Sequence, residues 1–144
     1  MTQRLLLPAL DSDSAPFWEA AARGEIRMQV CAACGRLRFP PRPMCPHCQS
    51  MVDDWRLMSG LGSVWSVVVP HPPLLPGYAE LAPYNVIAVV LDEDPVLRLV
   101  GNLVASADGP INEVDPTTIE IGMRVRAVFP AAVEGVVLPR WVAG

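Results

Sequence analysis

Apolar residues near the start of the chain follow first a helical period and then a strand period. Phe17, Ala20 and Ala21 recur at helical spacing. Because a proline precedes them and a glycine follows, the pattern predicts a short helix over residues 15–23. Residues 26–30 then alternate between apolar and polar side chains, which predicts a strand. This strand runs directly into a cysteine motif.

From residue 55 onward, apolar segments are separated by glycine, proline and acidic residues. The segment 70–83 is rich in proline and has no period, so it is expected to be a loop. Gly60 and Gly62 interrupt the first apolar segment, and glycines of this kind mark bends in barrel strands. The pattern predicts five strands, at residues 55–69, 84–91, 96–104, 123–129 and 136–142.

The number and spacing of these strands favour a mainly β protein. A five-stranded, partly open Greek-key barrel of the oligonucleotide/oligosaccharide-binding (OB) type fits them. A small two-layer sandwich is the alternative.

Four cysteines form the strongest chemical pattern in the chain. CAAC begins at residue 31, and CPHC follows it after ten residues. Zinc prefers four soft ligands in a tetrahedron, and two tight C-x-x-C turns supply them. We therefore predict one zinc ion bound by Cys31, Cys34, Cys45 and Cys48. Such a site has no open coordination position, so the metal is expected to be structural.

Other uses of the cysteines explain the pattern less well. The N-terminus does not resemble a signal peptide, so we expect a reducing, cytoplasmic compartment in which disulfides are rare. A thioredoxin-like redox pair accounts for only one of the two motifs. An iron–sulfur cluster also takes four thiolates and remains an alternative. His47, inside the second motif, is a candidate substitute ligand.

Catalytic residues are hard to find in this sequence. The two histidines are His47 and His71, and the second lies between prolines in the expected loop. An acidic group at residues 92–94 lies in an expected turn, where acidic residues are common. The sequence contains no nucleophile elbow, metalloprotease motif or phosphate-binding loop. We therefore expect a protein that is not an enzyme by itself.

Charge and hydropathy restrict the partners. Apolar residues make up 51% of the chain, yet no apolar run approaches the length of a membrane span, so we expect no membrane association. After residue 56, nine acidic residues face four arginines, which argues against nucleic acid as a partner. Five aromatic residues could stack on bases or fill the barrel core: Trp55, Trp65, Tyr78, Tyr84 and Phe129.

Three arginines lie between or beside the cysteines, in a segment without acidic residues. Arg36, Arg38 and Arg42 are candidates to bind the phosphates of a nucleotide-like ligand such as coenzyme A. The alternative is that they neutralise the negative charge of four thiolates around one zinc ion.

The order of these features resembles a known family, the zinc-ribbon/OB-fold proteins associated with acyl-CoA metabolism (domain of unknown function 35). The resemblance covers nearly the whole chain. It rests on Phe17-Trp18, CAACGRLRFPPRPMCPHC at 31–48, SGLGSVWSVVV at 59–69, PYNVIAVVLDEDPVLRLVGNLV at 83–104, IGMRVRAVF at 121–129 and LPRW at 138–141.

This resemblance implies an arm and helix over residues 1–25, a rubredoxin-like zinc ribbon over 26–54 and an OB-fold over 55–144. It also implies a non-catalytic accessory subunit. The partner would be a thiolase-superfamily enzyme, such as a lipid-transfer-protein-like aldolase, or a hot-dog-fold hydratase. The ligand would be an acyl-CoA thioester of steroid or fatty-acid degradation. A single-stranded nucleic-acid-binding OB-fold protein is the alternative function.

Overall fold

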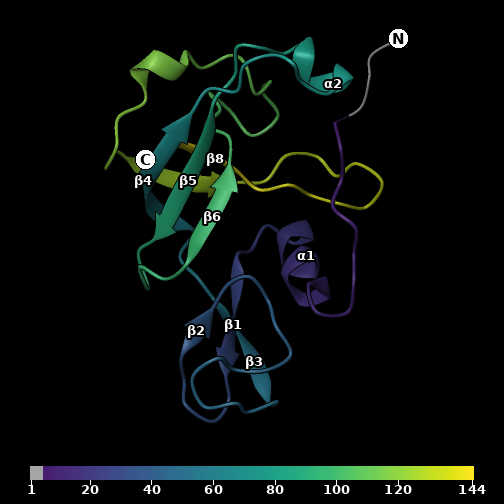
Figure 1. The fold of residues 1–144 in the computed structure, drawn as a ribbon, viewed down its shortest axis with the longest axis vertical. Coiled ribbons are helices and arrows are strands. Elements are labelled where there is room, and N and C mark those ends of the chain that lie inside the picture. The colour runs from purple at the N-terminus through teal and green to yellow at the C-terminus, as the bar shows by residue number, and fades with distance from the viewer. Residues whose placement is uncertain (1–4) are drawn as a thin grey trace.

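Two antiparallel sheets and a short helix make up the computed structural model, which describes residues 5–144. Figure 1 shows the small sheet at one end of the long axis, the larger sheet at the other, and the first helix beside the small sheet. The elements are α1 (Ala15–Ala22), β1 (Arg27–Cys31), β2 (Leu37–Arg38), β3 (Asp53–Leu57), β4 (Leu61–Val68), α2 (Pro76–Ala79), β5 (Val86–Leu91), β6 (Arg98–Gly101), the 3-10 turn η1 (Pro116–Thr118), β7 (Arg124–Val128) and β8 (Arg140–Ala143).

Helix α1 matches the sequence prediction to within one residue at its end. Pro16 occupies its first turn, where the missing amide hydrogen costs nothing. The helix ends before Gly24, which adopts a left-handed backbone with a φ of 78°. Phe17, Ala20 and Ala21 are its buried residues, as their spacing predicted.

The small sheet has the order β2-β1-β3 and corrects one prediction. The expected long strand over residues 55–69 is two strands in different sheets, because β3 pairs with β1 from Cys31↔Asp53 to Arg27↔Leu57. The chain then turns at Gly60, which has a φ of 77°, and continues as β4, the central strand of the larger sheet. The apolar positions continue through this turn, so the sequence pattern alone did not separate the two strands.

The larger sheet confirms the predicted five-stranded OB-fold. Its order is β6-β5-β4-β7-β8, with every neighbouring pair antiparallel. A parallel bridge between Leu103 and Trp141 brings its two ends together. The Trp141 amide donates to the Asn102 carbonyl at 3.1 Å, and the Val104 amide donates to the Trp141 carbonyl at 2.8 Å. These contacts close the sheet into a barrel.

One hydrophobic core runs through both sheets. It includes Phe17 of α1 and Met28 of β1, continues through Met58 at the connection, and reaches Val89 and Trp141 in the barrel. The ribbon and barrel are therefore packed against each other.

A second core covers the outside of the barrel beneath the proline-rich loop. Its buried members are Tyr84, Val104, Ile111 and Val142. Tyr78, in the proline-rich loop, packs against it with its ring 6.0 Å from that of Tyr84. Apolar residues of the loop are thus partly covered by this chain itself.

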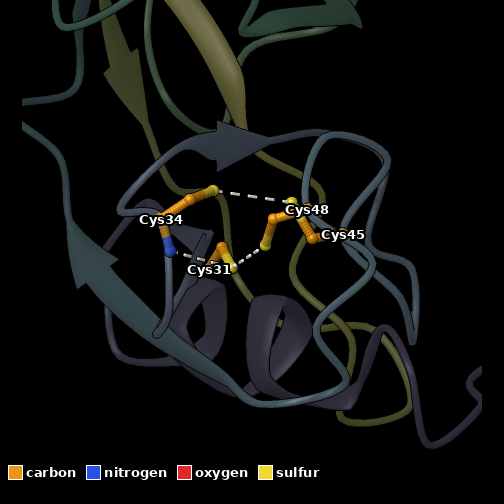
Figure 2. A group of neighbouring side chains, drawn as sticks. All are labelled: Cys31, Cys34, Cys45 and Cys48. Carbon is orange, nitrogen blue, oxygen red and sulfur yellow. Dashed lines mark hydrogen bonds between the residues drawn. The ribbon is translucent and has the colours of Figure 1, made fainter.

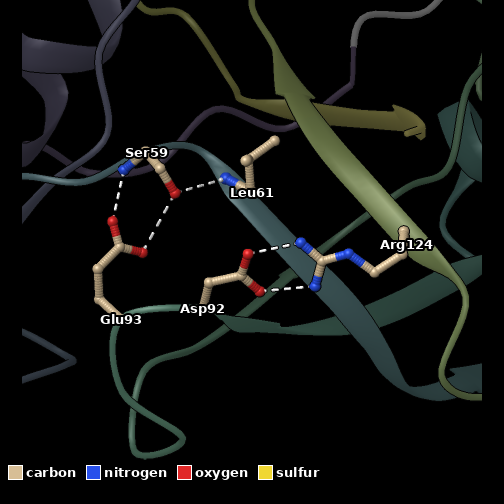
Figure 3. A network of polar contacts seen from close by, with 5 residues as sticks. All are labelled: Ser59, Leu61, Asp92, Glu93 and Arg124. Carbon is tan, nitrogen blue, oxygen red and sulfur yellow. Dashed lines mark hydrogen bonds and ion pairs between the residues drawn. The ribbon is translucent and has the colours of Figure 1, made fainter.

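Acidic residues of the β5–β6 turn tie the connection between the sheets to the barrel (Figure 3). The Glu93 carboxylate accepts from the Ser59 amide at 2.6 Å. Asp92 binds both terminal nitrogens of Arg124, at 2.7 and 2.5 Å. The acidic cluster noticed in the sequence therefore has structural contacts.

None of the helices within residues 5–144 combines the length and apolar character needed to cross a bilayer.

Candidate metal centre

The first pair of cysteines lies where β1 ends and turns toward β2. Cys31 is the last residue of β1, and the Gly35 amide donates to its carbonyl at 2.9 Å. Gly35 has a φ of 76°, a conformation that glycine adopts without steric cost. The Cys34 amide points back to the Cys31 sulfur at 3.4 Å. This turn directs both thiols to the same side.

The second pair repeats the same turn with a different residue after it. The Gln49 amide donates to the Cys45 carbonyl at 3.0 Å, as Gly35 does to Cys31. Gln49 has a φ of 64°, so a residue with a side chain holds the left-handed position here. The Cys45 amide also donates to the Ser50 carbonyl at 2.9 Å. A glycine is a sequence signal for this backbone conformation after the first pair, whereas Gln49 carries no such signal after the second.

The four sulfurs converge in a geometry that fits one zinc ion (Figure 2). All four lie within 4.8 Å of one another. The Cys31 and Cys48 sulfurs are 3.5 Å apart, and the Cys34 and Cys45 sulfurs are 3.7 Å apart. A tetrahedron with zinc–sulfur bonds of about 2.3 Å has sulfur–sulfur edges of about 3.8 Å. The donor set and its spacing therefore suit zinc.

Backbone amides favour the thiolate forms that zinc requires. The Cys34 amide, aimed at the sulfur of Cys31, lowers the pKa of that thiol to about 6. The amide of Cys48 likewise lowers the pKa of the Cys45 thiol. Hydrogen bonds to a charged form stabilise that form, so each turn favours the thiolate of its first cysteine.

This centre has the form of a structural zinc site. Cys31 and Cys45 are buried, whereas Cys34 and Cys48 reach the surface. Four protein thiolates fill the tetrahedral shell, so no position is open to water or substrate. Among the described residues, these four are the group of side chains placed to hold a metal.

His47 lies beside this group but outside it. Its side chain is exposed, and its Nδ1 lies 2.7 Å from an Arg36 terminal nitrogen. His71, the other histidine, is also exposed and lies in the loop between β4 and β5.

The three arginines near the cysteines do not share one surface. Arg36 and Arg42 are exposed, but Arg38 is only 4% exposed. The Arg38 Nη2 donates to the Arg42 carbonyl at 2.9 Å. This hydrogen bond helps to hold the loop that leads to Cys45 and Cys48. Because Arg38 is buried, only Arg36 and Arg42 remain as candidates for a phosphate contact.

Gln29 is the site residue that the sequence did not predict. It is one of the polar residues in the alternating segment 26–30, yet it is 3% exposed. Its Nε2 donates to the Arg42 carbonyl and its Oε1 accepts from the Arg42 amide, both at 2.8 Å. This two-bond clamp positions the loop that leads to Cys45, and no local sequence signal indicates it.

The five aromatic residues proposed as a stacking platform are dispersed. Trp65 is exposed on β4, where the Arg98 guanidinium lies 4.0 Å from its ring centre. Tyr84 belongs to the outer core, and Trp55 and Phe129 pack against the main core. They form no continuous surface for stacked bases.

Two family models match consecutive parts of the chain. The model "ChsH2, rubredoxin-like zinc ribbon domain" matches residues 18–51. The model "ChsH2, C-terminal OB-fold domain" matches residues 55–130.

Curated relatives include two bacterial hydratase subunits. The chain is 43% identical over 118 residues to a probable enoyl-CoA hydratase alpha subunit of Thermomonospora curvata, covering 82% of this chain and 33% of that protein. It is 34% identical over 125 residues to the 3-oxo-4,17-pregnadiene-20-carboxyl-CoA hydratase alpha subunit of Mycobacterium tuberculosis, covering 87% and 36%. The chain thus spans about a third of the length of these relatives.

The match covers a larger share of an archaeal relative and of one chain of a solved structure. The chain is 32% identical over 101 residues to a DUF35 domain-containing scaffold protein of Methanocaldococcus jannaschii, covering 69% of this chain and 63% of that protein. One chain of the solved structure described as "Ltp2-ChsH2(DUF35) aldolase" is 39% identical, with a TM-score of 0.80 and coverage of 95% and 98%.

Proposed function

Because this chain belongs to the ChsH2 (DUF35) family, in which a rubredoxin-like zinc ribbon precedes a C-terminal OB-fold domain, we propose that it is a non-catalytic subunit of an enzyme complex. Its partner is a thiolase-superfamily enzyme of the lipid-transfer-protein-like aldolase kind. The complex acts on acyl-CoA thioesters of steroid or fatty-acid degradation, and this chain helps to hold them.

The observation that carries this proposal is the similarity to one chain of the Ltp2-ChsH2(DUF35) aldolase. The two chains are 39% identical, and the match covers 98% of that chain. A match over nearly the full length supports a corresponding place in a complex. The hydratase alpha subunits among the relatives support a hot-dog-fold hydratase as the second candidate partner.

The geometry of the metal centre supports a non-catalytic role. Zinc that activates water keeps an open position, whereas four cysteine thiolates fill the shell here. The two histidines are exposed, and His47 is engaged by Arg36. The scaffold name of the archaeal relative agrees with this role.

We propose that Arg36 and Arg42 bind the phosphates of coenzyme A. Both side chains are exposed near the metal centre, and guanidinium groups bind phosphate oxygens with two parallel hydrogen bonds. The segment between Cys31 and Cys48 contains no carboxylate, and Asp94 of the β5–β6 turn borders the same surface hollow as Arg36.

Co-expression with a thiolase-like enzyme from the same genome, followed by size-exclusion chromatography, tests the proposal. We expect one heteromeric peak that contains zinc and has higher thioester activity than the enzyme alone. This chain by itself is expected to turn over no thioester. Two separate peaks, with full activity in the enzyme's own peak, would reject the subunit role. The same experiment with a hot-dog-fold hydratase distinguishes the two candidate partners.

A further inference from the structure

A cavity of about 260 Å³ lies where the helix, the ribbon and the barrel meet. At about 30 Å³ for each water-sized group, it has room for about nine such groups. Its walls are mostly aromatic and aliphatic: Phe17, Trp18, Phe39, Leu99, Leu138 and Trp141. A space with walls of this kind suits an apolar organic group better than water.

One side of this cavity carries a positioned cation. The Arg140 Nη1 donates to the Asn102 side-chain oxygen. Because a guanidinium only donates, the amide oxygen of Asn102 must face it. The Asn102 amide nitrogen in turn donates to the Asn85 carbonyl at 2.6 Å. These bonds hold the guanidinium beside Asn102, which like Arg140 lines the cavity.

Asn85 anchors this chain of hydrogen bonds inside the protein. Its side chain is fully buried and bonds both the carbonyl and the amide of Leu103, at 2.9 and 2.7 Å. The position of Arg140 is therefore set by buried groups and does not depend on a flexible surface loop.

The cation has no carboxylate partner among the residues that the structure describes. None of the residues lining the cavity is acidic, and Arg140 makes no ion pair within 4.0 Å. Burial lowers the pKa of its guanidinium, which reflects the cost of holding this charge away from water. An anion in the cavity would offset that cost.

Arg140 also borders a second cavity of about 250 Å³, on the side of Leu81 and Pro130. Asp108 lines that second space and brings a carboxylate to it. Repulsion from this carboxylate disfavours an anion there, so the aromatic cavity is the favourable position for one.

We propose that the aromatic cavity binds a small organic carboxylate of about nine non-hydrogen atoms in all, most of them in a compact apolar body. The carboxylate pairs with the donors of Arg140 that Asn102 does not use, and the body lies among the aromatic rings. The site uses neither the zinc ligands nor the arginines assigned to coenzyme A, so it goes beyond the function proposed above. Because its walls come from α1, the ribbon and the barrel, an occupant also stabilises their relative arrangement.

Titration of the zinc-loaded full chain with cyclohexanecarboxylate tests this site, with the neutral cyclohexanecarboxamide as the matched ligand. Indole resonances of Trp18 and Trp141 in ¹H–¹⁵N NMR spectra report on the cavity directly. We expect saturable shifts of both, and at least tenfold tighter binding of the carboxylate than of the amide. Equal affinities, or shifts confined to other parts of the molecule, would overturn the proposal.

Two substitutions complete the test. Arg140→Gln should abolish the preference for the carboxylate, whereas Arg56→Gln, at an exposed position of β3 outside the cavity, should keep it. If Arg140→Gln does not fold, Leu138→Trp fills the cavity while Arg140 stays, and should remove binding of both ligands. Unchanged binding in either cavity variant contradicts the proposal. No partner enzyme is present, so failure here leaves the subunit role standing.

Discussion

Replacing Cys45 with serine removes one of the four zinc ligands from the buried side of the metal centre. Cys45 is 1% exposed, and its sulfur lies 3.7 Å from that of Cys34. Its carbonyl also accepts from the Gln49 amide, so the residue belongs to both the ligand set and the turn. The substitution changes a single atom and leaves the size of the side chain almost unchanged.

The expected loss follows from the contribution of the metal. Structural zinc in small ribbons contributes about 10–16 kcal/mol, or about 2.5–4 kcal/mol for each of four thiolates. The segment between β1 and β3 contains only the two strand residues of β2. The buried residues of this segment are Leu37, Arg38 and Cys45. Ordering such a segment costs about 1–2 kcal/mol for each residue, so it cannot remain folded by its own packing. The barrel should remain folded because most of its core lies outside the segment.

Hydrogen exchange and elemental analysis measure this effect. A loss of about 2.5–4 kcal/mol corresponds to about a 70- to 900-fold drop in protection of the Gly35 and Gln49 amides. Zinc content should fall well below one ion per chain, while the barrel amide of Val89 keeps its protection. His47→Ala, a change of an exposed residue between two ligands, should retain zinc and protection. Full zinc content and wild-type protection in Cys45→Ser would refute the assignment.

Four further results are expected. Substituting Arg36 and Arg42 together with glutamine should raise the KM of the complex for its CoA thioester without separating the subunits on size-exclusion chromatography; an unchanged KM would remove the phosphate role. Fluorescence anisotropy should show single-stranded DNA binding weaker than about 1 μM at physiological salt, since the barrel is acidic; tight, salt-sensitive binding would contradict this. Gly62→Ala should destabilise the barrel by about 1–3 kcal/mol in urea, because the added carbon meets the backbone of β5, and wild-type stability would argue against this packing. The Arg124 guanidinium holds the pKa of Asp92 below its ordinary 3.8, so this pair stabilises the barrel above that value and is lost as pH falls through the lowered pKa; Arg124→Gln should raise this pKa in an NMR titration, and no rise would exclude the ion pair.

The metal centre was predictable because its information is local. Each C-x-x-C turn places two thiols together through contacts within a few residues, so spacing alone identified Cys31, Cys34, Cys45 and Cys48. The five-stranded barrel was also predictable, since each strand carries its own apolar segment between turn residues. The same local signals gave helix α1 nearly to the residue.

Other features depend on contacts between distant segments, and only the tertiary structure decided them. Residues 55–69 became two strands because β3 pairs with β1, which lies more than twenty positions earlier in the chain. Arg38 was a candidate for a phosphate contact, but it is buried where β2 meets the loop held by Gln29. The cavity beside Arg140 joins a helix, a ribbon loop and two barrel strands. Local sequence patterns do not encode contacts of this kind, because such contacts depend on how whole elements pack around a shared core.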